Sequence, residues 1–353
     1  MGRAPGGRAA GFFDDDGRSK TPRDSVSTPP SDSARSALDT LVERVRAHPN
    51  VQDKLHINQA YEEPVGRTVP FDHPLFPDVA DEEVRIGDDC AALPNGRDGH
   101  LLFAAEGILP DFVQAHPWFA GYSAVMVNLS DICAMGGRPL AVTDMLWIED
   151  AADGDEVWAG MQAAADDYGV PVVGGHTSYR CAPKHLGVAV LGEARQLLTS
   201  YDAAPGDTLM MAVDLDGAYF EDYPFWNASV DAAPERLQAL LPLMQTVAEK
   251  GWSQAAKDIS MGGLVGTLAM LLHTSEVGAE LRLDDVPRPP GVDWEKWLVS
   301  FPSLGYLLAV PDEHVPAVRS HFQAHDLACA AVGTIEASDG LRVAHEGTTA
   351  ALF

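Results

Sequence analysis

Paired and clustered acidic residues are the first sign of chemistry in this sequence. Asp88 and Asp89 are adjacent, and they lie between Gly87 and a run of small residues. Carboxylate oxygens are ligands that Mg²⁺ prefers in proteins. The pair therefore indicates a magnesium site, while the alternative is a turn whose acids are only solvated. Side chains alternate along a strand, so an extended segment would aim only one of the two at a given site.

Two further polar segments follow apolar runs. Glu106 comes directly after the apolar stretch 101–105, a position that suits a site at a sheet edge and is also common on a plain surface. Asn128 and Asp131 are three residues apart in the string NLSDICAMGGRP, so they share one face of a helix. The small residues and the double glycine of this string permit close backbone approach. Helix capping explains the glycines but not the whole string.

A double glycine also follows the apolar run 170–173. In the segment Gly174-Gly175-His176-Thr177-Ser178, backbone N–H groups after a strand could cradle a phosphate. No GK[ST] follows, so this is not a Walker A loop. The alternative is an ordinary tight turn. His176 is either a metal or phosphate contact or a hydrogen-bonded loop histidine.

The last such segment is KDISMGGL, which begins at Lys257 and opens a predicted helix. Asp258 or Ser260 suits an N-cap. The same geometry at a helix N-terminus makes a site for an anion or a metal-bound phosphate. Both interpretations stay open at this stage.

Regular helices and strands must position these residues. Apolar periodicity predicts a short helix through Leu38 and Val45, before Pro49. The predicted strands are 101–105, 139–147, 170–173, 186–191, 208–213, about 303–310 and 329–335. The predicted helices are 117–135, 153–168 with Asp153 as N-cap, 233–249, 262–275 and 313–325. A turn at 205–207 suggests a domain boundary, and the pattern predicts two α/β halves, each with mixed strands and helices.

Composition limits the partners. The chain has 353 residues and a net charge of −28, which repels nucleic acid and anionic membranes. It also repels ATP, so a bound nucleotide would need metal ions as bridges; the alternative is that the acids only maintain solubility. No apolar run is long enough to span a membrane, and the N-terminus does not resemble a signal peptide. The four scattered cysteines fit a reducing compartment, so we expect a cytoplasmic protein.

In this order, the five segments resemble one superfamily. It contains aminoimidazole ribonucleotide synthetase, formylglycinamidine ribonucleotide synthetase, thiamine monophosphate kinase, selenophosphate synthetase and the hydrogenase maturation dehydratase. The resemblance covers roughly residues 84–340. NLSDICAMGGRP looks like the kinase and selenophosphate synthetase segments, GGHTS is similar to the selenophosphate synthetase version, and KDISMGGL resembles the amidine synthetase.

The resemblance implies a fold and a site. An N-terminal α/β domain would form a barrel with a second chain, a C-terminal α+β domain would pack against it, and ATP would lie near the dimer interface. The implied domains are a disordered tail 1–35, a helix and irregular segment 36–83, an ATP-binding domain 84–204 and a C-terminal domain 205–353. The implied Mg²⁺ ligands are Asp88, Asp89, Glu106, Asp131 and Asp258, of which Asp88, Asp131 and Asp258 would be catalytic. The implied nucleotide contacts are Asn128, Ser130, Gly174, Gly175, His176, Thr177 and Lys257.

The implied activity is ATP-dependent phosphorylation or activation of an amide, carbonyl or phosphate oxygen of a small molecule, of the synthetase or dehydratase type. One alternative is a kinase of the thiamine monophosphate type. Another is a non-catalytic nucleotide-binding relative, because His176 and Met261 stand where thiamine monophosphate kinase usually has acids. No cysteine precedes Cys90, which disfavours selenophosphate synthesis. The implied partners are a small substrate and a second copy, and a partner that supplies ammonia is left open.

An aromatic group between Tyr219 and Trp226 has two interpretations. It could line a substrate pocket, or it could belong to the core or to an interface.

Overall fold

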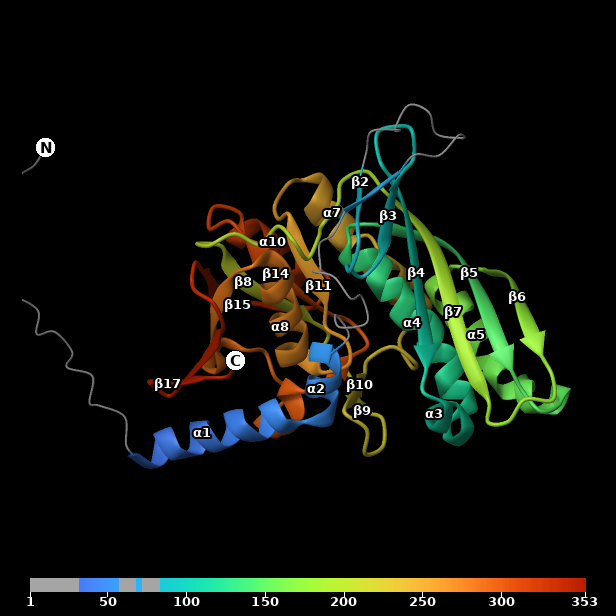
Figure 1. The fold of residues 1–353 in the computed structure, drawn as a ribbon, viewed down its shortest axis with the longest axis horizontal. Helices are drawn as coiled ribbons and strands as arrows, with labels where there is room; N and C mark the ends of the chain where they lie inside the picture. Colours follow the sequence, from blue (N-terminus) through green and yellow to red (C-terminus); the bar gives the residue numbers. More distant parts are fainter. Residues whose placement is uncertain (1–31, 57–67, 72–82) are drawn as a thin grey trace, which may run out of the picture.

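The structure is a computed structural model that describes residues 32–56, 68–71 and 83–353 (Figure 1). Most of the predicted tail and much of the predicted irregular segment lie outside these ranges. The helices are α1 (Asp32–Ala47), α2 (Pro49–His56), α3 (Pro110–Ala115), α4 (Pro117–Ala134), η3 (Ala151–Gly154), α5 (Asp155–Tyr168), α6 (Pro234–Leu240), α7 (Leu243–Glu249), α8 (Gly263–Ser275), η4 (Leu283–Asp285), α9 (Trp294–Leu298) and α10 (Val315–Gln323).

The strands fall in both halves of the chain. They are β1 (Thr68–Pro70), β2 (Glu83–Arg85), β3 (Ala91–Pro94), β4 (His100–Ile108), β5 (Arg138–Trp147), β6 (Val172–Ser178), β7 (His185–Ala194), β8 (Thr208–Val213), β9 (Ala218–Tyr219), β10 (Phe225–Asn227), β11 (Ala255–Asp258), β12 (Gly278–Arg282), β13 (Phe301–Pro302), β14 (Gly305–Val310), β15 (Ala328–Glu336), β16 (Leu341–His345) and β17 (Thr348–Ala351).

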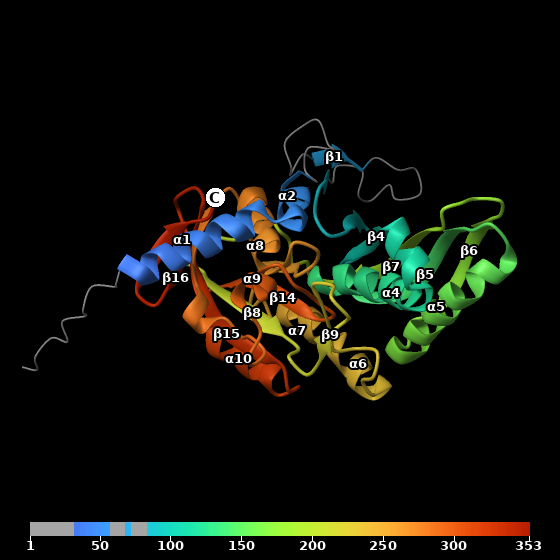
Figure 2. The ribbon, with the colours of Figure 1, turned by 90° about the horizontal axis from the view of Figure 1, so that it is seen from below.

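The N-terminal half is a five-stranded sheet in the order β3-β4-β7-β5-β6, with only β5 and β6 parallel. Helices α4 and α5 lie along one face of this sheet (Figure 2). The two helices approach closely at Gly121 and Gly160. A Cβ on Gly160 would lie 1.9 Å from the carbonyl oxygen of Trp118, and one on Gly121 would lie 2.1 Å from that of Val157. Glycine at both positions is therefore what permits this packing.

The C-terminal half is a seven-stranded sheet in the order β11-β14-β8-β15-β12-β16-β17. Alternate residues of its strands bury against opposite layers, as the two-residue period of a strand requires. Met211 and Leu307 pack in the layer that holds α1, α2, α8 and α9. Met210 and Leu308 pack in the layer that holds α7, α10 and the end of α4. Helices α1 and α2 therefore pack on the C-terminal half (Figures 1 and 2).

Most of the predicted elements are present. The helix predicted over 117–135 is α4, the strand over 139–147 is β5, and the strand over 208–213 is β8 with the same bounds. The helix predicted over 233–249 is wrong as one element, because α6 ends before Pro242 and α7 begins after it. Proline lacks an N–H and its ring clashes with the preceding turn, so it separates the two helices.

The predicted cap of the helix at 153–168 is also wrong. Asp150 caps the short helix η3, accepting hydrogen bonds from the N–H groups of Ala152 and Asp153. Helix α5 then follows with Gly154 at its N-cap and no side-chain cap. Within the described ranges, no helix is long and apolar enough to cross a membrane.

Candidate active site

Three carboxylates from distant parts of the sequence converge between the two halves. Asp89 lies in the turn before β3, Asp131 is on α4, and Asp258 ends β11. One oxygen of each lies within 4.8 Å of the others. Asp131 is 7% exposed and Asp258 is 3% exposed. We call these three residues the acid group.

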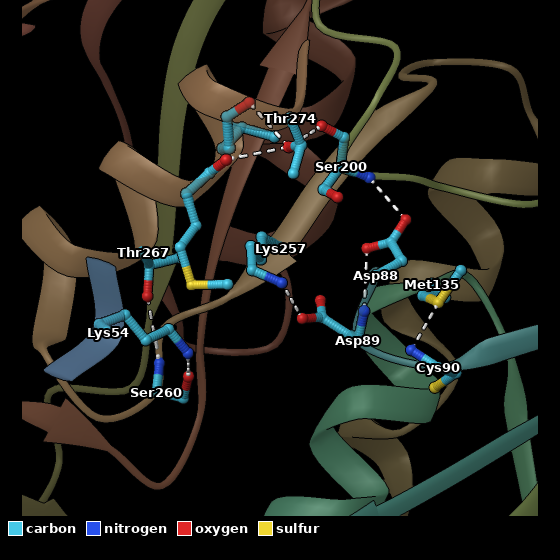
Figure 3. Close-up of polar contacts among 12 residues, drawn as sticks. Lys54, Asp88, Asp89, Cys90, Met135, Ser200, Lys257, Ser260, Thr267 and Thr274 are labelled. Atoms are coloured by element: carbon cyan, nitrogen blue, oxygen red, sulfur yellow. Dashed lines mark hydrogen bonds and ion pairs between the residues drawn. The ribbon is translucent and has the colours of Figure 1, made fainter. Parts of the chain in front are cut away.

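The turn that carries Asp89 is fixed by its neighbours. Gly87 has a φ of 110°, a left-handed conformation that favours glycine. The Asp88 carboxylate accepts hydrogen bonds from the N–H of Asp89 at 2.9 Å and of Ser200 at 2.8 Å. The N–H of Cys90 donates to Met135 Sδ at 3.1 Å, just beyond α4 (Figure 3). Asp88 thus ties the turn to the segment that joins the two halves, and the structure does not bring it into the acid group.

Asp258 is the last residue of β11, an edge strand of the seven-stranded sheet. It pairs with Tyr306 of β14, and a turn with positive φ at Gly262 and Gly263 leads into α8. A Cβ on Gly263 would lie 2.4 Å from the backbone of Val299. The N-cap of α8 is Gly262, and no side chain caps this helix. The capping interpretation of Asp258 and Ser260 is therefore wrong.

Two lysines lie beside the acids. Lys257 Nζ bonds to Asp89 Oδ1, and both side chains are nearly buried, at 3% and 6% exposure (Figure 3). Lys54 Nζ donates to Ser260 Oγ at 2.6 Å. Lys54 belongs to α2, which packs against α8. The sequence analysis missed Lys54, because nothing in a short polar helix indicates which distant segment it contacts.

Burial makes the acids resist ionisation. Desolvation, and next the charge of Asp89, raise the pKa of Asp258 to about 7, although Lys54 and Lys257 oppose the shift. Desolvation and the charge of Asp258 raise the pKa of Asp131 well above its ordinary value. Desolvation and the charge of Asp89 raise the pKa of Asp88 to about 6. Desolvation disfavours the charged form of Lys257, but the carboxylates of Asp89 and Asp88 outweigh it and raise its pKa.

The acid group fits a divalent cation. Asp89 Oδ2 is buried and has no hydrogen-bond partner. A buried carboxylate oxygen without a partner is costly, and a hard cation such as Mg²⁺ is the ligand that satisfies it. The pKa values of these acids are raised first by desolvation and next by neighbouring carboxylates, and a bound cation would oppose both effects.

Glu106 lies close enough to the group to interact with it electrostatically. Its side chain is exposed on β4, yet desolvation raises its pKa, and Lys54 lowers it while Asp89 raises it further. Because the side chain is accessible to water, hydration keeps this upward shift of the pKa small. The structure places Glu106 at the solvent side of the site.

The structure does not bring the other predicted contacts to the acid group. Asn128 is fully buried, and its Nδ2 donates to the carbonyl of Ala124 at 2.7 Å, within its own helix. Ser130 lies by the Tyr306 hydroxyl and forms a hydrogen bond with it. Desolvation and the nearby Cys133 raise the pKa of Tyr306, and the hydrogen bond from Ser130 opposes this shift only in part.

The predicted phosphate loop at 174–178 is wrong as a loop. These residues continue β6, which pairs in parallel with β5 as far as Ser178. A neighbouring strand supplies the backbone hydrogen bonds, so the glycines remain extended. Gly175 leaves room for the side chain of Asp144, because a Cβ on Gly175 would lie 1.7 Å from Asp144 Oδ1. The sequence analysis did not identify Asp144. Gly174, Gly175 and His176 are exposed at the sheet edge opposite to β3.

The aromatic group near Tyr219 forms an interface between the two halves. Phe220 stacks on Phe119 of α4 at 3.8 Å between ring centroids. Tyr223 meets Phe112 of α3 edge to face at 5.0 Å. Of the two interpretations, the structure supports packing.

A cavity of about 540 Å³ lies beside the Asp88 turn. Its lining includes Arg85, Thr199, Tyr201 and Ser253, but none of the acid group. It is therefore separate from the place where the three carboxylates meet.

Comparisons with known proteins match this architecture. The sequence model "AIR synthase related protein, N-terminal domain" matches residues 87–194, and the corresponding C-terminal domain matches 197–346. An uncharacterised protein of Synechocystis sp. is 46% identical over 261 residues, which are 74% of this chain and 81% of that protein. A protein of Methanocaldococcus jannaschii, also uncharacterised, is 32% identical over 263 residues, with coverages of 74% and 81%.

Solved structures share the fold. T. maritima PurL complexed with ATP superposes with a TM-score of 0.62 at 19% identity, over 72% of this chain and 44% of PurL. This chain therefore spans less than half of PurL. AaThiL complexed with AMPPCP and TMP has a TM-score of 0.57 at 21% identity, with coverages of 74% and 88%. Both domain models, the close relatives and the shared fold agree: the chain belongs to the AIR synthase-related family.

Proposed function

We propose that this protein is an ATP- and Mg²⁺-dependent enzyme that phosphorylates or activates an amide, carbonyl or phosphate oxygen of a small molecule. The observation that carries the proposal is the convergence of the Asp89, Asp131 and Asp258 carboxylates, together with a buried oxygen of Asp89 that lacks a hydrogen-bond partner. A group of three carboxylates between two domains suits metal-bound phosphates.

In this proposal Asp89, Asp131 and Asp258 hold Mg²⁺, which neutralises charge that develops on a transferred phosphoryl group. Asp88 keeps the turn in place through the Ser200 and Asp89 N–H groups. Lys54, from α2, lies at the edge of the acid group and supplies a positive charge that attracts phosphate oxygens.

The ligands of two structures with the same fold support a nucleotide. PurL was solved with ATP, and AaThiL with AMPPCP and TMP. Members of the family include ATP-using kinases and synthetases, so the chemistry after phosphoryl transfer is the open choice for this chain.

We further propose that the protein is a homodimer that forms across the five-stranded sheet. One face of that sheet carries exposed apolar side chains, including Phe103, Met145 and Leu191, which are 51%, 42% and 40% exposed. The strand registers place these three side chains on the same face, opposite to the helices. Phe103 pairs with Leu191, and Met145 pairs with Gly187, which lies an even number of residues from Leu191 on β7 and so faces the same side. A second copy would cover this surface.

The dimer also explains where the β6 residues act. In one chain, His176 and the acid group lie toward opposite edges of the sheet. In a barrel formed by the two sheets about a two-fold axis, the apolar faces would point inward and the β6 edge of one chain would lie beside the β3 edge of its partner. We therefore propose that Gly174–Thr177 contact nucleotide bound to the partner's acids, in the cytoplasm where ATP is available.

Loss of two acids tests the enzymatic proposal. We expect Asp131→Asn and Asp258→Asn each to reduce Mg²⁺-dependent ATP consumption by about 10³-fold or more, because each removes a charged metal ligand from a buried site. Consumption is measured during a screen of amides, carboxamides and phosphate esters. The control Asp39→Asn changes an exposed acid of α1 and should retain wild-type activity.

The products separate the two chemistries. Free phosphate with an aminated or dehydrated product indicates a synthetase or dehydratase, and a phosphorylated product indicates a kinase. Full metal-dependent turnover in both Asn variants would show that the acid group is not the metal site.

A further inference from the structure

Lys257 brings a built-in cation into the acid group. Its side chain is 3% exposed, and its Nζ contacts a carboxylate that also belongs to the proposed metal site (Figure 3). The residue lies on β11 directly before Asp258, so the same strand supplies one acid and one cation. A buried lysine in this position is unusual, because an ammonium group loses its hydration there.

The two oxygens of Asp89 have different surroundings. Oδ1 bonds to Lys257, while Oδ2 is buried and has no hydrogen-bond partner. Oδ1 thus already has a cationic partner, the Lys257 ammonium, whereas Oδ2 is left for an ion from solution.

Charge balance sets how many ions the group can hold. With a metal ion bound, the three carboxylates are ionised and carry three negative charges, of which Lys257 offsets one. A single divalent ion then makes the nucleotide-free group neutral. A second divalent ion would leave an excess of positive charge in a buried place, which is costly. Lys54 does not take this role, because its Nζ bonds to the Ser260 hydroxyl and not to a carboxylate.

We propose that the Lys257 ammonium occupies one cation position of the acid group, so that the nucleotide-free protein binds one divalent ion per chain there and not two. This inference rests on the proposed metal site, and it assigns Lys257 to the carboxylates and not to nucleotide phosphates.

The wild-type protein gives the first test. Full-length, nucleotide-free protein is titrated with Mn²⁺, and bound ions are counted by electron paramagnetic resonance. We expect one tightly bound ion per chain. Two tight ions in the wild type overturn the inference, whatever any variant does.

Lys257→Met gives the second test. It removes the charge and keeps much of the side-chain volume. We expect a second Mn²⁺ per chain, and about tenfold or greater tightening of the first, because a positive charge no longer repels it. Lys257→Arg should restore the wild-type count. The matched control Lys250→Met removes an exposed lysine and should change neither value.

Other outcomes are decisive as well. An unchanged count and affinity in Lys257→Met overturns the inference. Weaker binding of the nucleotide analogue AMPPCP by this variant, with the metal count unchanged, assigns Lys257 to phosphate and also overturns it. If Lys257→Met fails to fold, the number of tightly bound Mn²⁺ ions in the wild type and in Lys257→Arg still tests the inference.

The proposed function can fail separately. A wild type that binds one Mn²⁺ but no AMPPCP supports the role of Lys257 and contradicts the ATP-dependent activity. A wild type that binds AMPPCP with two tight ions in the acid group supports the ATP-dependent activity and contradicts the role of Lys257. Absence of Mn²⁺ binding overturns both.

Discussion

At the residue scale, Asp258 shows how burial prepares a carboxylate for a metal. Its pKa rises to about 7, first through desolvation and next through the charge of Asp89. In the metal-free protein the group therefore prefers its proton at mildly acidic pH. A divalent cation supplies the positive charge that the site lacks, and it competes with that proton.

This competition predicts a pH dependence of metal binding. Asp258 is about 90% ionised at pH 8 and about 1% ionised at pH 5 for a pKa of about 7. We expect Mn²⁺ affinity to fall by roughly 100-fold between these pH values. Titration calorimetry at each pH measures it. Constant affinity over this range would contradict the raised pKa.

The stability of the metal-free protein should follow the opposite trend. The pKa of Asp258 in the folded protein lies above the ordinary aspartate value of 3.8, so its contribution to stability is fully present below that value and is lost as the pH rises through about 7. Added Mg²⁺ should therefore raise the melting temperature more at pH 8 than at pH 5. In Asp258→Asn this part of the pH dependence should disappear.

All three members of the acid group were among the metal ligands that the family resemblance implied, because each lies in one of the segments that carry it. The sequence did not indicate which of the adjacent acids would face the group, and the structure shows Asp89 there and Asp88 on backbone N–H groups. The Lys257–Asp89 contact joins residues far apart in the chain, and only the packed fold reveals it.

At the element scale, the crossing of α4 and α5 fixes the helix that carries Asp131. The crossing depends on Gly121 and Gly160, whose missing side chains let each backbone touch the other helix. Because α4 supplies one acid and packs under the sheet, a displaced α4 would separate the acid group.

This close approach predicts a large effect of one methyl group. We expect Gly160→Ala to lower the free energy of unfolding by about 2–3 kcal/mol, because its Cβ would meet the Trp118 carbonyl within the helix pair. Urea denaturation measures the change. The control Ala159→Val alters the exposed neighbour and should cost much less. Equal stability of Gly160→Ala and wild type would mean that the helices are free to move apart.

The strongly patterned elements were predictable from sequence, and the exceptions have physical causes. Helix α4 has a long apolar run and a double glycine beyond it, so its extent was clear. Strand β6 was predicted to stop before Gly174, because glycine pairs usually mark turns. Pairing with β5 keeps them extended instead, and this tertiary influence has no local signal.

At the scale of the whole molecule, β6 and β3 lie at opposite edges of the five-stranded sheet, and this separation underlies our proposal that a second chain completes the site. The exposed apolar face of the sheet offers the contact surface. The order of the strands could not be inferred from the sequence. Residues 174–178 were therefore predicted to form a loop near the acids, whereas in the structure they belong to the edge strand β6, far from them in the sheet.

A mixed dimer tests the shared site. We expect Asp131→Asn and His176→Ala each to be inactive as homodimers. Random pairing of the two chains should restore about a quarter of wild-type activity, because half of the dimers then contain one intact site out of two. The assay is ATP consumption after co-expression of both chains. No recovery, in mixed dimers verified by mass, would place the whole site within one chain.

Calorimetric titration of the wild-type protein with ATP, with and without Mg²⁺, tests the central claim most directly. The account predicts binding that requires Mg²⁺ and that Asp131→Asn abolishes, because phosphate reaches an acidic site only through a metal bridge. Binding of equal strength without metal, or no binding in either condition, would contradict the claim that the acid group is a magnesium–nucleotide site.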